Sequence, residues 1–113
     1  MTDSSVLTAI ANDYGYEYVF ERQIRGLGRP GDVLIAISIS GRSLNILRTI
    51  GAVRQQGLTV VGLTCRTGGE MADLCDLCLY APADGTQIVQ QLHITAAHII
   101  CGLVEECLFP RAR

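Results

Sequence analysis

The chain has 113 residues, of which 49% are hydrophobic and only 18% are charged. This composition excludes a disordered chain, because the apolar surface is large enough to offset the entropy lost on folding. Nine basic and eleven acidic residues give a net charge of -2 with no cluster of either sign, which excludes a basic surface for nucleic acid or for an anionic membrane.

Targeting and membrane-spanning segments are not expected in this sequence. No apolar run approaches the ~20 residues that cross a bilayer, and no basic flank precedes an apolar core at the N-terminus. We therefore expect a soluble, cytoplasmic protein. A small domain with so few charges leaves apolar surface exposed unless other subunits cover it, so we also expect an oligomer.

The spacing of apolar residues predicts alternating helices and strands. Continuous apolar runs indicate strands buried on both faces, and apolar residues three or four positions apart indicate helices. In chain order, the predicted elements are a mostly helical segment over residues 1–25, a strand over 32–38, a helix over 43–56, a strand over 58–64, a short helical stretch after Gly68 and Gly69, a strand over 77–80 and a long helix over 86–109.

This order of elements predicts the fold class, an α/β sandwich of three layers around a parallel sheet, in one domain over residues 1–113. Three strands make a thin sheet, so we expect the domain to lack N-terminal strands and helices of a complete one. The last predicted helix is apolar on nearly all sides. We interpret it as a helix at the centre of an oligomer, with an ordinary core helix as the alternative.

Five cysteines are present, and Cys75 and Cys78 form a CxxC pair. Such a pair suggests a redox site or half of a zinc site. However, the number of cysteines is odd, and no second CxxC or pair of histidines follows at zinc spacing. We therefore interpret Cys75 and Cys78 as small core residues.

Three serines and a glycine lie between the first predicted strand and the helix that follows it, in the segment Ile37-Ser-Ile-Ser-Gly-Arg-Ser43. Ligands bind at the carboxyl ends of parallel strands, and helix N-termini favour phosphate. Gly41 would let the backbone approach an anion, and Arg42 would add positive charge. A simple helix cap at Ser43 is the alternative, but capping needs only one of the three serines. The segment predicts a phosphate site.

This serine segment and the strands around it resemble the sugar isomerase (SIS) family of phosphosugar-binding domains. The resemblance runs along essentially the whole chain, through residues 7–15, 29–43, 57–69 and 90–98. It is greatest to the members that isomerise sedoheptulose 7-phosphate. It implies a Rossmann-like sandwich and the formation of D-glycero-D-manno-heptose 7-phosphate. It also implies a cytoplasmic homotetramer that supplies heptose for lipopolysaccharide.

The resemblance assigns substrate-binding roles to matching positions. Ser38, Ser40 and Ser43 would hold the sugar phosphate. Asp13 would face the substrate hydroxyls, and Thr86 would lie near the same pocket. These roles describe a sugar phosphate gripped at its phosphate end by hydroxyl groups.

The resemblance also implies a catalytic and a metal site on the last helix. His98 matches the family's catalytic histidine, the acid/base of an aldose–ketose proton transfer, and histidine suits such a shuttle. Gln90 matches a substrate position, and Gln90 and His98 match positions that bind zinc. Eight residues along a helix separate them by about 12 Å, so we predict that they serve one site only from different subunits. His93 has no such counterpart, and we interpret it as structural or interfacial.

The sequence departs from the family pattern in four side chains and one segment. Ile39 and Arg42 replace a usual threonine and asparagine, and Ile88 and Gln91 replace arginine and glutamate. The glycine-rich loop and the helix that carry the family's glutamate base and a histidine have no counterpart here. Two non-catalytic alternatives therefore remain open: a sugar-phosphate sensor, and a scaffold like the relatives that bind a replication initiator. The scaffold resembles this chain at residues 7–13 and 108–110, but it tends to lack the histidine found at position 98.

Overall fold

The computed structural model describes residues 1–111 and contains a parallel sheet of three strands. The strands are β1 (Val33–Ile37), β2 (Thr59–Thr64) and β3 (Leu77–Tyr80), in the order β1-β2-β3. All pairs are parallel, as the predicted elements require, so their carboxyl ends lie at one edge of the sheet. The predicted α/β class is confirmed.

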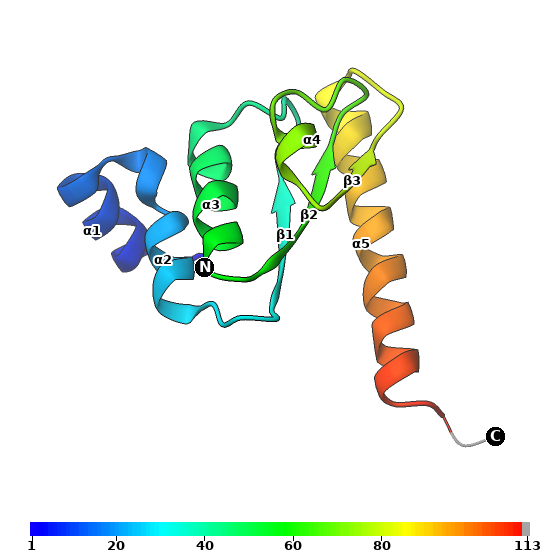
Figure 1. The fold of residues 1–113 in the computed structure, drawn as a ribbon. Helices are drawn as coiled ribbons and strands as arrows, with labels where there is room; N and C mark the ends of the chain where they lie inside the picture. The colour runs from blue at the N-terminus through cyan, green and yellow to red at the C-terminus, as the bar shows by residue number, and fades with distance from the viewer. Residues whose placement is uncertain (112–113) are drawn as a thin grey trace.

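Most helices cover one face of this sheet (Figure 1). They are α1 (Ser4–Tyr14), α2 (Glu21–Leu27), α3 (Leu44–Gln55) and the short α4 (Met71–Leu74), with a 3-10 turn at Tyr16–Tyr18. α3 packs directly against β1 and β2, and α2 packs against the outer side of α3. The mostly helical N-terminal segment is therefore confirmed.

The hydrophobic core lies between the sheet and α3. Fully buried Ile50 and Val53 of α3 meet Val60 of β2 and Met71 of α4. Burying one such side chain contributes about 1.5–3 kcal/mol relative to leaving it exposed. The remaining buried members of this cluster are Ile24, Ala36 and Leu58.

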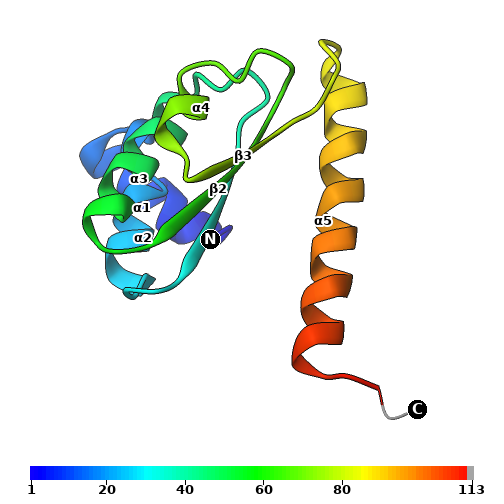
Figure 2. The same ribbon diagram turned by 45° about the vertical axis from the view of Figure 1, so that its right-hand side comes forward.

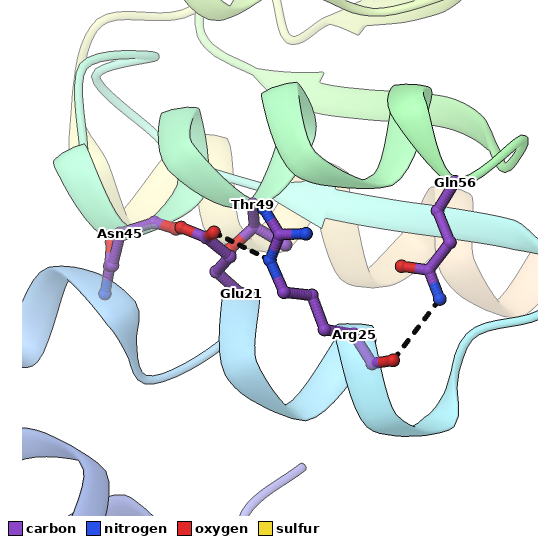
Figure 3. Close-up of polar contacts among 5 residues, drawn as sticks. All are labelled: Glu21, Arg25, Asn45, Thr49 and Gln56. Atoms are coloured by element: carbon purple, nitrogen blue, oxygen red, sulfur yellow. Dashed lines mark hydrogen bonds and ion pairs between the residues drawn. The ribbon is translucent and has the colours of Figure 1, made fainter. Parts of the chain in front are cut away.

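Polar contacts join α2 to α3 on the outer side of that core (Figure 3). Gln56, at the end of α3, donates from Nε2 to the carbonyl of Gly28 at 2.8 Å and to that of Arg25 at 3.4 Å. Glu21 and Arg25 form an ion pair of 2.9 Å within α2. The hydrogen bonds of Gln56 thus link α2 to α3, while the ion pair supports α2 itself.

The long helix α5 (Thr86–Leu108) lies alone on the opposite face of the sheet (Figure 2). Only Val89 and His93 are buried in it, and every residue from 101 to 111 is exposed. The radius of gyration is 15.2 Å, above the roughly 13 Å of a compact domain of this size. The predicted helix is confirmed, whereas within one chain its apolar surface stays uncovered.

By length and composition alone, α5 also passes as a membrane-spanning helix, since it has 23 residues and an 18-residue window of it has a mean hydropathy of 1.2 with 11% of that window buried. The sequence predicted no uninterrupted apolar run of this length, and α5 contains none. However, Gln90, Gln91 and His98 interrupt its apolar surface, and its first half packs on β2. We interpret α5 as a helix that packs on the sheet.

The first strand also differs from expectation. Its apolar run predicts burial on both faces, but Val33, Ile35 and Ile37 are 61%, 47% and 51% exposed. Leu34 and Ala36, which alternate with them, face α3 and are half-buried and buried respectively. The reason is that α5 contacts β2 and leaves the same face of β1 open.

The cysteines are free, and the CxxC pair packs against the core. Both Cys75 and Cys78 crowd the position where a side chain on Gly62 would lie, at 2.7 and 3.2 Å from their sulfurs. Burial raises the pKa of the Cys75 thiol to about 11, so little reactive thiolate forms at neutral pH. The interpretation as core residues is confirmed.

Candidate functional site

The segment between β1 and α3, residues 38–43, forms a loop at the carboxyl edge of the sheet, which we call the serine loop. Ser43 occupies the N-cap of α3 but makes no capping hydrogen bond through its side chain. Its Oγ lies 2.9 Å from Oγ of Ser38 instead. The simple cap is therefore excluded as the role of Ser43. A pair of hydroxyl groups thus lies at the N-terminus of α3, an arrangement suited to an anion.

Two glycine contacts fix the backbone of the serine loop. Gly41 has a φ of +63°, and a side chain there would collide with the carbonyl of Gly68 in the turn after β2. Gly69 has a φ of +56°, and a side chain there would collide with the carbonyl of Ser40. The amide of Met71 also donates to the carbonyl of Gly41 at 3.0 Å. The turn after β2 thus holds the loop in one conformation.

A cavity of about 640 Å³ opens between the serine loop and the first half of α5. Five of the predicted site residues, on two different elements, line it together: Ser38, Ser40, Ser43, Thr86 and Gln90. Its other walls are mostly apolar. They comprise Ile37, Ile39, His93, Ile94 and Ala97. Because the lining holds no carboxylate, nothing in it repels a phosphate.

Two predicted residues lie away from this cavity. Asp13 is exposed on α1, where its carboxylate accepts a hydrogen bond of 2.9 Å from Asn12, and it borders a different surface hollow. His98 is exposed on α5 next to Ala97, but it does not line the cavity. Within one chain, therefore, the predicted binding residues other than Asp13 meet, and the predicted acid/base does not join them.

The residues of one chain do not build a complete zinc site. Gln90 lines the cavity and His98 lies outside it. Over residues 1–111, no three His, Cys, Asp or Glu side chains gather closely enough to hold an ion. A zinc site at Gln90 and His98 would need ligands from beyond the single described chain.

Two residues of the site were not singled out from the sequence for a role in it. His93 is buried, at 4% exposure, and its Nε2 lies 3.0 Å from the carbonyl oxygen of Thr64. The structural interpretation of His93 is therefore confirmed, although it also lines the cavity. Thr64 is fully buried at the end of β2. A signal for His93 was present, since it follows Gln90 by three residues and so shares its helix face.

Comparison with known proteins agrees with this geometry. Residues 1–65 match the family model described as SIS domain. The chain belongs to the SIS domain family. The match covers β1 and the serine loop, the two segments that build one wall of the cavity.

This chain is similar to several named relatives. It is 51% identical over 107 residues to a phosphoheptose isomerase of Rhodospirillum rubrum, covering 95% of this chain and 57% of the relative. It is 52% identical over 108 residues to that of Nitratidesulfovibrio vulgaris, covering 96% of this chain and 52% of the relative. The chain thus spans about half the length of the curated relatives it matches.

Solved structures agree as well. The phosphoheptose isomerase of Neisseria gonorrhoeae superposes with a TM-score of 0.90 at 42% identity, covering 93% of this chain and 59% of that one. The enzyme of Francisella tularensis superposes with the same TM-score at 29% identity, covering 94% and 57%. The prediction of a partial SIS sandwich is confirmed.

Proposed function

We propose that this chain is the phosphosugar-binding part of a phosphoheptose isomerase, which converts sedoheptulose 7-phosphate into D-glycero-D-manno-heptose 7-phosphate. The observation that carries the proposal is the paired hydroxyls of Ser38 and Ser43, turned away from helix capping. They face Thr86 and Gln90 across a cavity of about 640 Å³, within the range of small-molecule sites. The names of the relatives support the substrate.

The serine loop would bind the phosphate end of the substrate. The hydroxyls of Ser38, Ser40 and Ser43 line the cavity, and the positive end of the α3 dipole points at the same place. Thr86 and Gln90 offer a hydroxyl and an amide on the opposite wall, where the sugar hydroxyls would lie. Each wall would therefore recognise one end of the sugar phosphate.

The isomerisation needs a proton acceptor at carbon and a proton donor at oxygen, because moving a carbonyl between C1 and C2 passes through an enediol. We assign this shuttle to His98, as the family resemblance implies. Because His98 is exposed and outside its own cavity, we place it in the site of a neighbouring subunit of a homotetramer. The exposed apolar residues of α5, such as Ile99 and Leu103, support a subunit contact there.

The cofactor and the cellular role follow from the same proposal. Gln90 and His98 would contribute to a zinc ion whose remaining ligands come from outside the described chain. Zinc would polarise the substrate carbonyl. We also infer a cytoplasmic enzyme that supplies heptose for lipopolysaccharide.

The test is an isomerisation assay with sedoheptulose 7-phosphate and added zinc. We expect turnover that disappears in His98→Ala, while binding of the sugar phosphate is retained. Ser43→Ala should weaken binding itself. Gln91→Ala is the matched control, since Gln91 is exposed on α5 and does not line the cavity. Turnover unchanged by His98→Ala would contradict the assigned role.

A second candidate is a sugar-phosphate sensor that binds without turnover. It is favoured by one observation: the binding residues meet in the cavity, while His98 and Asp13 do not reach it. In that case the sugar phosphate would bind through Ser43 with equal affinity in the wild type and in His98→Ala, and neither protein would isomerise it.

A further inference from the structure

One buried residue, Thr64, connects the two walls of the cavity. Its hydroxyl donates a hydrogen bond of 3.2 Å to the carbonyl of Ile39 in the serine loop. Its own carbonyl accepts from Nε2 of His93 on α5 at 3.0 Å, and from the amide of Ala81 at 2.9 Å. A continuous chain of hydrogen bonds therefore runs from the serine loop, through the end of β2, to α5.

The bond to Thr64 also defines the state of His93. A carbonyl oxygen only accepts, so Nε2 carries the hydrogen in this contact. Nδ1 is buried without a hydrogen-bond partner. An apolar side chain of similar size would fill this space without a buried unsatisfied nitrogen, which costs free energy. The hydrogen bond from Nε2 of His93 to Thr64 therefore does more than fill the space beside the sheet.

The position of His93 on α5 indicates what this hydrogen bond does. Val89 and His93 are the two buried residues of α5, so they contribute most to its packing against the sheet. His93 follows Gln90 by three residues and Thr86 by seven, which places all three on one helix face. Both Thr86 and Gln90 line the cavity. The placement of that wall thus depends on the bond between His93 and Thr64.

We propose that His93 and Thr64 are positioning residues, whose hydrogen bonds hold Thr86 and Gln90 at a fixed separation from the serine loop. This inference rests on the proposed function, because it requires a ligand that spans both walls. Inorganic phosphate needs only the serine loop, whereas a sugar phosphate needs both walls. The two probes therefore separate positioning from a general loss of structure.

The experiment measures the affinity of the full chain for inorganic phosphate and for sedoheptulose 7-phosphate. His93→Leu should weaken sugar-phosphate binding about tenfold, the effect of about one hydrogen bond, while phosphate binding changes less than about twofold. His93→Gln, which offers an N–H donor near the position of Nε2, should recover most of the loss. The double variant His93→Leu/Gln90→Ala should lose less affinity than the sum of the two single losses, because His93 acts in part through Gln90.

Two further variants sharpen the test. Val89→Ala removes packing at the other buried position of α5 and leaves the hydrogen bond between His93 and Thr64 in place. Adding His93→Gln to Val89→Ala should therefore recover no sugar-phosphate binding. Thr64→Val removes the hydroxyl that holds Ile39 and keeps the carbonyl that holds His93. Because it loosens the serine loop itself, Thr64→Val should weaken the binding of both probes.

The proposal is overturned if His93→Gln binds the sugar phosphate as weakly as His93→Leu, or if the losses in the double variant add. If the wild type binds neither probe, the proposed function fails. Protection of backbone amides from hydrogen exchange then tests the positioning roles of His93 and Thr64 by themselves. His93→Leu should lower protection at the start of α5 and leave that of the serine loop unchanged, whereas Thr64→Val should lower it in the serine loop. Unchanged protection at the start of α5 in His93→Leu would also overturn the proposal.

Discussion

The two faces of the sheet differ in how much of their apolar surface the chain itself covers. On the face toward α3, a helix of 12 residues buries four side chains, and Ile50 and Val53 are fully enclosed. On the opposite face, a helix of 23 residues buries only two. The less covered helix, α5, is the more apolar of the two, so hydrophobic content alone does not say whether a face is covered within the chain. The closed face holds the fold together, and the open face carries one wall of the cavity.

The largest expected effect comes from the same truncation made on each face. Ile50→Ala removes a fully buried side chain of the closed face, which should lower the free energy of unfolding by about 2–5 kcal/mol. Ile35→Ala removes a side chain that is 47% exposed on the open face, and it should cost less than about 1 kcal/mol. Urea denaturation of both variants measures the difference. An equal cost would mean that Ile35 itself is buried in the assembled protein, beyond a subunit contact made by α5.

The second prediction compares two glycines on either side of the start of α3. Gly41→Ala forces a side chain onto a φ of +63° and against Gly68, so it should cost about 1–3 kcal/mol and reduce phosphate affinity more than tenfold. Gly51, inside α3, has open space around it, so Gly51→Ala should stabilise the chain by about 0.5–1 kcal/mol. Thermal unfolding and phosphate titration measure both effects. If Gly41→Ala still bound phosphate with normal affinity, the serine loop would not be the phosphate site.

The closed face and the serine loop could be predicted from the sequence because their signals are local. Apolar patterns located the three strands and the helices α3 and α5, and the three serines and the glycine of the loop lie within six residues of each other. Such patterns reflect backbone geometry within one element or one turn. The apolar run of β1 correctly indicated a strand. It indicated that both faces of the strand would be buried, but not which segment would pack against each face.

The link between Thr64 and His93 could not be predicted in the same way. The two residues are 29 positions apart, and their contact exists only because α5 returns across the end of β2. Asp13 and His98 present the opposite case. Their roles came from the family resemblance, and the geometry of one chain leaves both outside the cavity. Tertiary packing decides both outcomes, and periodicity carries no information about it.

The third prediction asks whether other subunits cover the open face. Leu103 is 57% exposed on α5, and Leu103→Glu should disrupt a contact between subunits because it places a charge in an apolar interface. Gln55→Glu adds the same charge at an exposed position of α3 and should leave the assembly intact. Sedimentation analysis should show the tetramer in the wild type and in Gln55→Glu, and smaller species in Leu103→Glu. Identical sedimentation of all three would remove α5 from the subunit contact.

The smallest expected effect separates the cysteines of the two faces. Cys75 packs against the core of the closed face, and burial raises its pKa to about 11 from the ordinary 9.0, whereas Cys101 is exposed on α5. At neutral pH, iodoacetamide should therefore modify Cys101 well before Cys75, which mass spectrometry of timed samples would show. Because the folded state holds the Cys75 proton more tightly, its contribution to stability is full below about pH 9 and is lost as the pH rises toward 11. Cys75→Ala should flatten part of that alkaline decline. Equal modification rates at neutral pH would show that the turn before β3 opens readily, and the closed face would then be less firmly packed than its burial indicates.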